Sequence, residues 1–260
     1  MKAQRALVTG AGKRLGRAMA LYLGERGFDV AVHYATSADA AAEVVGELRA
    51  KGVKAQAVQA DLLVEEEAAQ LVDRAVEALG GPLTVLVNNA SIYEADSIET
   101  GTRESWDRHI ESNLRAPVVL TQAFATQAPD TGQDAHGEAV AQALVINMLD
   151  QRVRKLTPKF MSYTIAKMGL WAFTQTAAQA LAPRIRVNAI GPGPTLQGAH
   201  QERDMFEAQR AATILERGSN PEDITAALGY FIDADGVTGQ LLCVDGGQHL
   251  AWNTPDILTD

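Results

Sequence analysis

The fold of this chain is decided by one stretch near its start, Ala6-Leu7-Val8-Thr9-Gly10-Ala11-Gly12-Lys13-Arg14-Leu15-Gly16. Its first four residues are an apolar run typical of a short buried strand, and helical apolar spacing follows from Arg17 to Glu25. A strand, a glycine turn and a helix in this order bring backbone N–H groups and the positive end of a helix towards a phosphate. The stretch therefore predicts a nucleotide-binding turn, with its third glycine one residue later than in the common G-x-G-x-x-G pattern.

The rest of the chain alternates strands and helices. Helical patterns lie between the expected strands, which are residues 29–34, 53–60, 83–87, 143–148, 185–190 and 241–247. This alternation predicts a single α/β domain over residues 1–260, a doubly wound parallel sheet of about seven strands with helices on both faces. Residues 129–137 are expected to form a polar loop without regular structure.

The bulk composition narrows the class of protein. The 260 residues are 47% hydrophobic and 21% charged, which is enough for one large core. A formal net charge of -9 argues against a nucleic-acid or anionic-membrane surface but leaves room for a small basic pocket. The single cysteine, Cys243, excludes an intrachain disulfide and suits a reducing compartment. With no hydrophobic leader or membrane-length segment in the sequence, we expect a cytoplasmic protein.

The end of the second expected strand indicates which dinucleotide binds. An acidic residue there would hydrogen-bond the ribose hydroxyls of NAD, and none is present. His33 and Ser37 stand in its place, and Lys13 and Arg14 come from the glycine turn. Together they are able to surround a 2′-phosphate, so we expect NADPH. For His33, a hydrogen bond to the backbone is the alternative.

Other residues with chemical potential follow later strands of the expected sheet. Asp61 and Leu62 come after the third strand, where an adenine ring is contacted in parallel sheets. Asn89 comes after the fourth, where an amide indicates either a binding edge or a capped turn. Asp150 follows the fifth. We expect these residues to meet at the carboxyl edge of the sheet.

The segment Ser162-Tyr163-Thr164-Ile165-Ala166-Lys167 offers a proton donor. Tyr163 and Lys167 are four residues apart, so on a helix they share a face, where an ammonium group helps a phenol to lose its proton. Taken alone, this pair is most simply an exposed tyrosine and lysine on a helix surface. The motifs in the rest of the chain favour the chemical interpretation.

These motifs together resemble the short-chain dehydrogenase/reductase family over essentially the whole chain. The matching residues are Thr9 to Gly16, Asn88-Asn89-Ala90, Asn113, Tyr163 with Lys167, Pro192-Gly193 and Val244-Asp245-Gly246-Gly247. The resemblance implies a Rossmann-like fold with Tyr163 as proton donor. It implies that Lys167 lowers the pKa of that tyrosine and binds the nicotinamide ribose, and that Asn113 holds a relay water. A homotetramer is also implied.

Motifs and resemblance together predict a set of residues that contact NADP(H). These are Gly10, Lys13, Arg14, Leu15, Gly16, His33, Tyr34, Ser37, Asp61, Leu62, Asn89, Ala90, Tyr163, Lys167, Pro192 and Gly193. No metal site is expected. Trp252 either covers the site of a neighbouring subunit or packs locally.

Two departures from the family pattern change the expected substrate. Arg14 stands where the family usually has glycine, and Asp150 stands where it usually has serine. A serine hydroxyl donates a hydrogen bond to a ketone oxygen, whereas an ionised aspartate repels that oxygen as negative charge develops on it. A carboxyl group beside a phenol is better suited to passing a proton to a ring nitrogen. The departures therefore predict reduction of a C=N bond.

Both departures resemble the pteridine reductase and dihydromonapterin reductase branch. This resemblance implies that Arg14, Ser91 and Tyr93 hold a pterin, with Tyr93 stacked on its ring, whereas a surface loop aromatic is the alternative for Tyr93. A segment near 194–217 is expected to cover the substrate. We therefore expect an NADPH-dependent reductase of a small pterin or dihydrofolate-like molecule. The alternatives are a carbonyl reductase of a 3-oxoacyl thioester, sugar or other ketone, and a nucleotide-sensing protein without chemistry.

Overall fold

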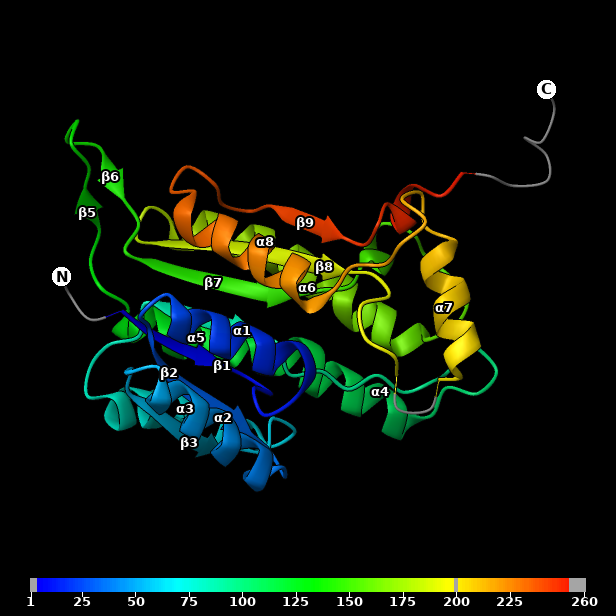
Figure 1. Cartoon of the computed structure of the whole chain (residues 1–260), viewed down its shortest axis with the longest axis horizontal. Helices are drawn as coiled ribbons and strands as arrows, with labels where there is room; N and C mark the ends of the chain where they lie inside the picture. The colour runs from blue at the N-terminus through cyan, green and yellow to red at the C-terminus, as the bar shows by residue number, and fades with distance from the viewer. Residues whose placement is uncertain (1–3, 199–200, 253–260) are drawn as a thin grey trace.

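A parallel sheet of seven strands runs through the middle of the protein (Figure 1). In the computed structural model, which describes residues 4–198 and 201–252, its order is β3-β2-β1-β4-β7-β8-β9 and all neighbouring strands are parallel. The strands are β1 Arg5–Val8, β2 Asp29–Tyr34, β3 Ala55–Gln59, β4 Val85–Asn88, β7 Ala143–Met148, β8 Ile185–Pro192 and β9 Leu241–Val244. The order reverses between β1 and β4, so the expected doubly wound sheet is confirmed. Ligands of such sheets bind at this reversal, beyond the carboxyl ends of the strands.

Helices cover both faces of the sheet. One face packs against α1 Arg14–Glu25, α2 Ala38–Ala50 and α8 Pro221–Asp233, and the other against α3 Glu65–Leu79, α5 Ala116–Gln127 and α6 Met161–Leu181. Successive residues of β1 point to opposite faces of the sheet. Ala6 and Val8 lie in the core on the side of α1, α2 and α8, and Leu7 lies in the core on the side of α3, α5 and α6. Strands that are buried on both faces are apolar throughout, which is why the sequence shows short continuous apolar runs.

Three regions differ from the sequence-based expectation. Residues 129–137 are not wholly irregular, because β5 Gly132–Gln133 and β6 Ala139–Val140 form an antiparallel hairpin that projects beyond the sheet (Figure 1). Between β4 and β7, α4 Arg103–Ile110 continues through a π-helical turn, η1 Glu111–Arg115, into α5. Short 3-10 turns follow β7 and β9, namely η2 Gln151–Val153 and η3 Gln248–Leu250.

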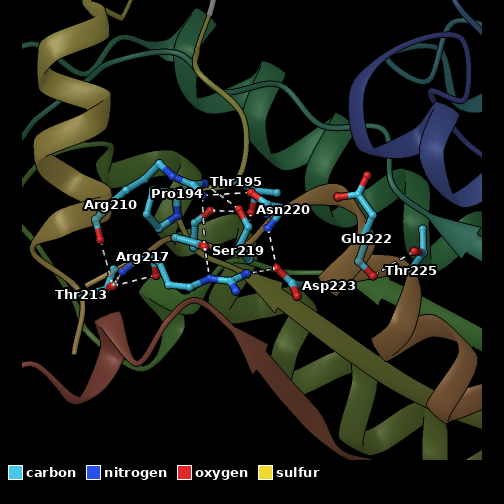
Figure 2. A network of polar contacts seen from close by, with 12 residues as sticks. Pro194, Thr195, Arg210, Thr213, Arg217, Ser219, Asn220, Glu222, Asp223 and Thr225 are labelled. Carbon is cyan, nitrogen blue, oxygen red and sulfur yellow. Dashed lines mark hydrogen bonds and ion pairs between the residues drawn. The ribbon is translucent and has the colours of Figure 1, made fainter. Parts of the chain in front are cut away.

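The excursion between β8 and α8, which contains α7 Arg203–Ala211, is fastened at its two ends (Figure 2). The Arg210 guanidinium donates to the carbonyl oxygens of Pro194 at 2.9 Å and Ser219 at 2.7 Å. The hydroxyl oxygens of Thr195 and Ser219 are 2.6 Å apart. These contacts hold the start of the excursion against its end.

Within the described residues, no helix combines the length and the apolar character that crossing a membrane requires.

Candidate active site

The end of β4 holds the glycine turn in place. The Thr9 hydroxyl accepts hydrogen bonds from the backbone N–H groups of Asn89 at 2.8 Å and Ala90 at 2.9 Å. The Asn89 side chain donates to the Thr9 carbonyl at 2.8 Å. The two residues predicted to contact the cofactor thus also fix the turn that faces it.

The turn itself has the shape of a phosphate cradle. A Cβ on Gly16 would lie 2.2 Å from the Gly10 carbonyl oxygen, so only glycine fits there, and Gly10 has a φ of 62°. Lys13 precedes α1 as its N-cap and makes no side-chain capping hydrogen bond, and the first turn of α1 carries no acidic residue. No side chain therefore caps the first N–H groups of α1, which suits the binding of an anion.

His33 is hydrogen-bonded to the backbone, which was the alternative to a place beside the 2′-phosphate. Its side chain is buried, Nδ1 accepts a hydrogen bond from the Gly10 N–H at 3.0 Å, and Nε2 lies 3.1 Å from the Ala60 carbonyl oxygen. These partners require a neutral ring with the proton on Nε2. Burial lowers the pKa of His33 to about 4, so the ring stays neutral. Both nitrogens bind backbone, which leaves Lys13 and Ser37 as the candidates for a 2′-phosphate.

Arg14 spans two parts of the site. Its guanidinium donates to the carbonyl oxygens of Leu196 at 3.0 Å and Gln197 at 2.8 Å, at the start of the segment expected to cover the substrate. Its φ is 53°, a backbone conformation that favours glycine, which accounts for glycine as the usual residue of the family pattern here. In this structure Arg14 therefore links the glycine turn to the covering segment.

The other predicted cofactor residues lie along the same carboxyl edge. Tyr34 ends β2, Asp61 and Leu62 follow β3, and Pro192 ends β8 with Gly193 after it. Leu15, in the first turn of α1, packs against the core that lies between the sheet and α1, α2 and α8. Their contacts with NADP(H) remain predictions.

Tyr163 and Asp150 meet at the carboxyl end of β7. The Tyr163 hydroxyl donates to Asp150 Oδ2 at 3.1 Å, and the Tyr163 residue is only 6% exposed. Burial, followed by the charge of Asp150, raises the pKa of Tyr163 well above its ordinary value. The expectation that Lys167 lowers this pKa stays a prediction. The phenol stays protonated, as a proton donor must before reaction.

Lys167 lies one helical turn further along α6, as predicted. Its Nζ donates to the Met148 carbonyl oxygen at 2.8 Å and is 5.6 Å from the centre of the Tyr163 ring. Burial lowers the pKa of Lys167 to about 8, while the nearby Asp150 opposes the shift. A buried ammonium is thus held close to the phenol.

Asn113 holds the loop that follows β4. It is fully buried in η1, where its Oδ1 accepts from the Ile92 N–H at 2.9 Å and its Nδ2 donates to the Ile92 carbonyl at 2.8 Å. These bonds place the neighbouring residues Ser91 and Tyr93. The relay water expected on Asn113 stays a prediction.

Tyr93 lies beside Tyr163, and about half of its surface is exposed. Its ring centre is 4.8 Å from that of Tyr163, in an edge-on arrangement with an interplanar angle of 79°. Ser91 is exposed beside it, and its hydroxyl donates to the Ile92 carbonyl at 3.4 Å. The structure therefore brings the predicted substrate residues Ser91 and Tyr93 to the same part of the edge.

Several residues of this region were missed by the sequence analysis. His109 is buried, its Nε2 accepts from the Glu94 N–H at 3.1 Å, and its Nδ1 lies 2.7 Å from the Ser162 hydroxyl, which in turn donates to Asp96. This chain of bonds ties the loop of residues 91–97 to the start of α6. Arg152 and Phe160, which contact Tyr93, were also missed. Only the basic run of residues 152–159 hinted at them.

The arrangement is suited to acid–base chemistry beside a bound dinucleotide. A protonated phenol, a carboxyl group and a buried amine lie together at the carboxyl ends of the strands. In the part of the chain that the structure describes, no group of His, Cys, Asp and Glu side chains is arranged to bind a metal ion.

Comparison with known proteins gives three kinds of match. Residues 4–208 match the model of the short chain dehydrogenase family. FolM alternative dihydrofolate reductase 1 from Brucella canis, solved in complex with NADP, is 42% identical with a TM-score of 0.90, over 98% of this chain and 97% of that one. The angucycline C-6 ketoreductase LanV with bound NADP is 32% identical with a TM-score of 0.85, over 95% and 96%. The 3-oxoacyl-(acyl-carrier-protein) reductase FabG of Staphylococcus epidermidis is 31% identical over 250 residues, which are 94% of this chain and 98% of that protein.

Proposed function

The chain belongs to the short-chain dehydrogenase/reductase family, and we propose that it reduces the C=N bond of a pterin or dihydrofolate-like substrate. It is an oxidoreductase, and its cofactor is NADP(H), the dinucleotide carried by solved relatives at 42% and 32% identity. The identity of the substrate is the part that we propose here.

The chain has groups that fit this cofactor. The uncapped start of α1 and the close-packed Gly10–Gly16 turn suit the pyrophosphate. Lys13 is exposed at the turn, and Ser37 lies beside Gly12, where its hydroxyl is 3.4 Å from the position of a Cβ on that glycine. The four residues directly after β2, Ala35 to Ala38, include no acidic side chain that would repel a 2′-phosphate.

One observation supports C=N reduction above all others, the hydrogen bond between Tyr163 and Asp150 at 3.1 Å. A carboxyl group at this place would oppose the negative charge that develops on a ketone oxygen during hydride transfer. A ring nitrogen that takes a proton as its carbon takes a hydride acquires no such charge. The FolM relative, at 42% identity, is named as a dihydrofolate reductase, which agrees with this choice.

The residues of the chain supply the proton. The hydride for the carbon comes from bound NADPH, and the nitrogen takes the hydroxyl proton of Tyr163 as the C=N double bond becomes a single bond. The resulting phenolate lies beside Asp150, through which a solvent proton returns, and the buried ammonium of Lys167 stabilises its charge. Arg14, Ser91 and Tyr93 hold the substrate ring in this proposal.

A carbonyl reductase is the second candidate, because two of the similar proteins are named as ketoreductases or 3-oxoacyl reductases. The same fold and cofactor site serve both chemistries, so only the substrate edge separates them. The segment 194–217 would cover either substrate. A homotetramer is also proposed, and size-exclusion chromatography with light scattering tests it.

The deciding experiment compares three substrates, with the unmodified protein and with variants of Asp150. NADPH oxidation is measured with dihydrobiopterin, dihydrofolate and a simple 3-ketoester for the unmodified protein, Asp150→Asn, Asp150→Ser and the exposed control Asp130→Ser. We expect pterin turnover by the unmodified protein and the control, and a loss of about 10²-fold or more in both Asp150 variants. The serine variant should gain ketoester turnover. Good ketoester turnover by the unmodified protein, without pterin turnover, would establish the carbonyl reductase instead.

A further inference from the structure

Tyr93 belongs to a stack of three side chains whose other members have no role in the mechanism above. Its ring lies parallel to that of Phe160, with ring centres 4.2 Å apart and an interplanar angle of 9°. The Arg152 guanidinium lies over Phe160, with its central carbon 5.0 Å from the ring centre. The same guanidinium donates to the Tyr93 hydroxyl at 3.3 Å. Arg152 therefore contacts both aromatic rings.

Arg152 is itself anchored on several sides. Its NH1 donates to the Thr157 hydroxyl at 2.7 Å and to the Lys159 carbonyl at 3.1 Å. Its backbone N–H donates to Asp150 Oδ1 at 2.7 Å. The guanidinium is thus built into the loop that joins β7 to α6, two residues from the carboxyl group that contacts the catalytic tyrosine.

The backbone is strained at Phe160, next to this stack. Phe160 has a φ of 59°, which is unusual for a bulky residue, and its N–H donates to the Asp96 carbonyl at 2.7 Å. The strained backbone directs the aromatic ring towards Tyr93 immediately before α6 begins. Strain of this kind collects where a side chain must be held for function.

We propose that Arg152 is a positioning residue that holds Tyr93 as a platform for the substrate ring. By binding the Tyr93 hydroxyl, Arg152 keeps one face of the ring against Phe160 and the ring nearly perpendicular to that of Tyr163, while 52% of Tyr93 stays exposed for a ligand. The description of the ligand as a pterin rests on the proposed function. The role of Arg152 also accounts for a tyrosine at position 93, since phenylalanine has no hydroxyl to anchor.

The physical gain is preorganisation. A loop aromatic that is free to rotate must be ordered when a ligand stacks on it, and this ordering weakens binding. A side chain that is already held by a hydrogen bond and a stack avoids the loss. Loss of Arg152 should therefore act on KM far more than on kcat.

A double-mutant cycle tests this indirect action. With dihydrobiopterin and NADPH, Arg152→Met and Tyr93→Phe should each raise KM about fivefold, the worth of an ordinary hydrogen bond, with little change in kcat. The double variant should resemble either single variant, because both remove the same contact. Arg152→Lys should recover part of the loss. Multiplying effects in the double variant would overturn the proposal.

Arg154→Met is the matched control for charge. Arg154 comes from the same basic loop, but its guanidinium lies over Trp171 at 5.4 Å, away from Tyr93. Its removal should leave KM within about twofold of the unmodified value. An equal rise in KM would show that the general positive charge of the loop matters and would contradict a role specific to Arg152.

A direct role for Arg152 in binding an anionic tail predicts a different pattern. Dihydrofolate carries carboxylates and dihydrobiopterin carries none, so direct binding would make Arg152→Met harmful to dihydrofolate alone. Our proposal predicts similar losses for both substrates, since both stack the same ring. Selective loss for dihydrofolate would overturn it.

A measurement on the substrate-free protein separates this proposal from the proposed function. The chain has five tyrosines, and ring-labelled tyrosine NMR with Tyr93→Phe identifies the Tyr93 signal. Arg152→Met should shift or broaden that signal and leave those of Tyr22 and Tyr230 unchanged, which also confirms folding. An unmoved Tyr93 signal would refute the contact even if pterins are reduced. Absence of pterin turnover with a shifted signal would refute only the substrate assignment.

Discussion

The cofactor half and the substrate half of the sheet edge are built in different ways. In the cofactor half, the ends of β1, β2 and β4 bind one another, with His33 and Asn89 hydrogen-bonded to the backbone of the glycine turn. In the substrate half, a phenol, a carboxyl group and a buried amine share a small space. The first half is stabilised by its own contacts, whereas the second places ionisable groups where burial disfavours their charge.

This contrast shows where the protein gives up stability for chemistry. Neutral groups with complete hydrogen bonds make a rigid scaffold at little cost. A buried amine with a lowered pKa lowers stability at neutral pH, and groups with displaced pKa values are typical of catalytic sites. Substitutions should therefore lower stability in the cofactor half and lower activity in the substrate half.

The largest effect is expected from removing the proton donor. Tyr163→Phe should lower kcat by about 10²–10⁴, the usual contribution of a positioned acid, and leave NADPH affinity within a few-fold. Steady-state turnover and NADPH fluorescence titration measure the two quantities. Tyr230→Phe, at an exposed tyrosine of α8, is the control and should be normal. Near-normal turnover of Tyr163→Phe would remove this residue from the mechanism.

Lys167→Met should separate activity from stability. Because the pKa of Lys167 is about 8 in the folded protein and 10.5 ordinarily, the unfolded chain binds more protons between these values. The stability of the unmodified protein should thus rise with pH across this window, and at pH 7 the buried charge is fully unfavourable. We expect the variant to be inactive yet more stable at pH 7 by about 3 kcal/mol, measured by urea unfolding. A less stable, active variant would contradict this account.

The buried, neutral His33 should make the stability of the protein fall in acid. Its folded pKa of about 4 lies below the ordinary 6.5, so stability that is present above pH 6.5 is lost as the pH falls towards 4. Because His33 is protonated in the unfolded chain but not in the folded protein, the free energy of unfolding should fall by about 2 kcal/mol between pH 7 and pH 5. Urea unfolding at both pH values should show a correspondingly smaller loss in His33→Gln, although that variant starts less stable. The exposed control His136→Gln should keep the full loss, and equal losses in all three proteins would contradict the buried role.

The smallest effect is expected where the two halves are joined. Arg14→Gly relieves the positive φ and removes the bonds to Leu196 and Gln197, so the unfolding free energy should change by less than about 1 kcal/mol. Because the covering segment is no longer tied to the glycine turn, KM for NADPH should rise roughly fivefold. Arg17→Ala, which removes an exposed ion pair with Glu47, is the control. Unchanged KM in Arg14→Gly would show that the two halves work independently.

Much of the fold could be predicted because its signals are local. Short apolar runs ending in glycine, asparagine or aspartate fixed the main sheet, and β7 has the expected bounds of 143–148. The hairpin β5–β6 was not predicted, because strands of two residues carry no periodicity. The π-helical turn η1 was also missed, since its residues have the pattern of an ordinary helix.

The site residues, too, could be predicted where their signals are local and not where they depend on distant parts of the chain. Tyr163, Lys167 and Asp150 could be found because their spacing and their place after strands point to chemistry. The orientation of His33 could not, because it depends on where the carbonyl of Ala60, from another strand connection, comes to lie. Nothing in the sequence pairs position 93 with 152 or 160, so the stack at Tyr93 emerged only from the folded chain.

The hydrogen bonds of Arg210 affect how an enzyme of this kind can evolve. Since Arg210 holds Pro194 beside Ser219, the stretch between β8 and α8 begins and ends at almost one point. A stretch with adjacent, fastened ends is an exchangeable cassette, because its length and composition can vary without moving β8 and α8, which it connects. Substrate preference can therefore be rewritten by grafting a relative's cassette, while the inherited catalytic groups stay where they are.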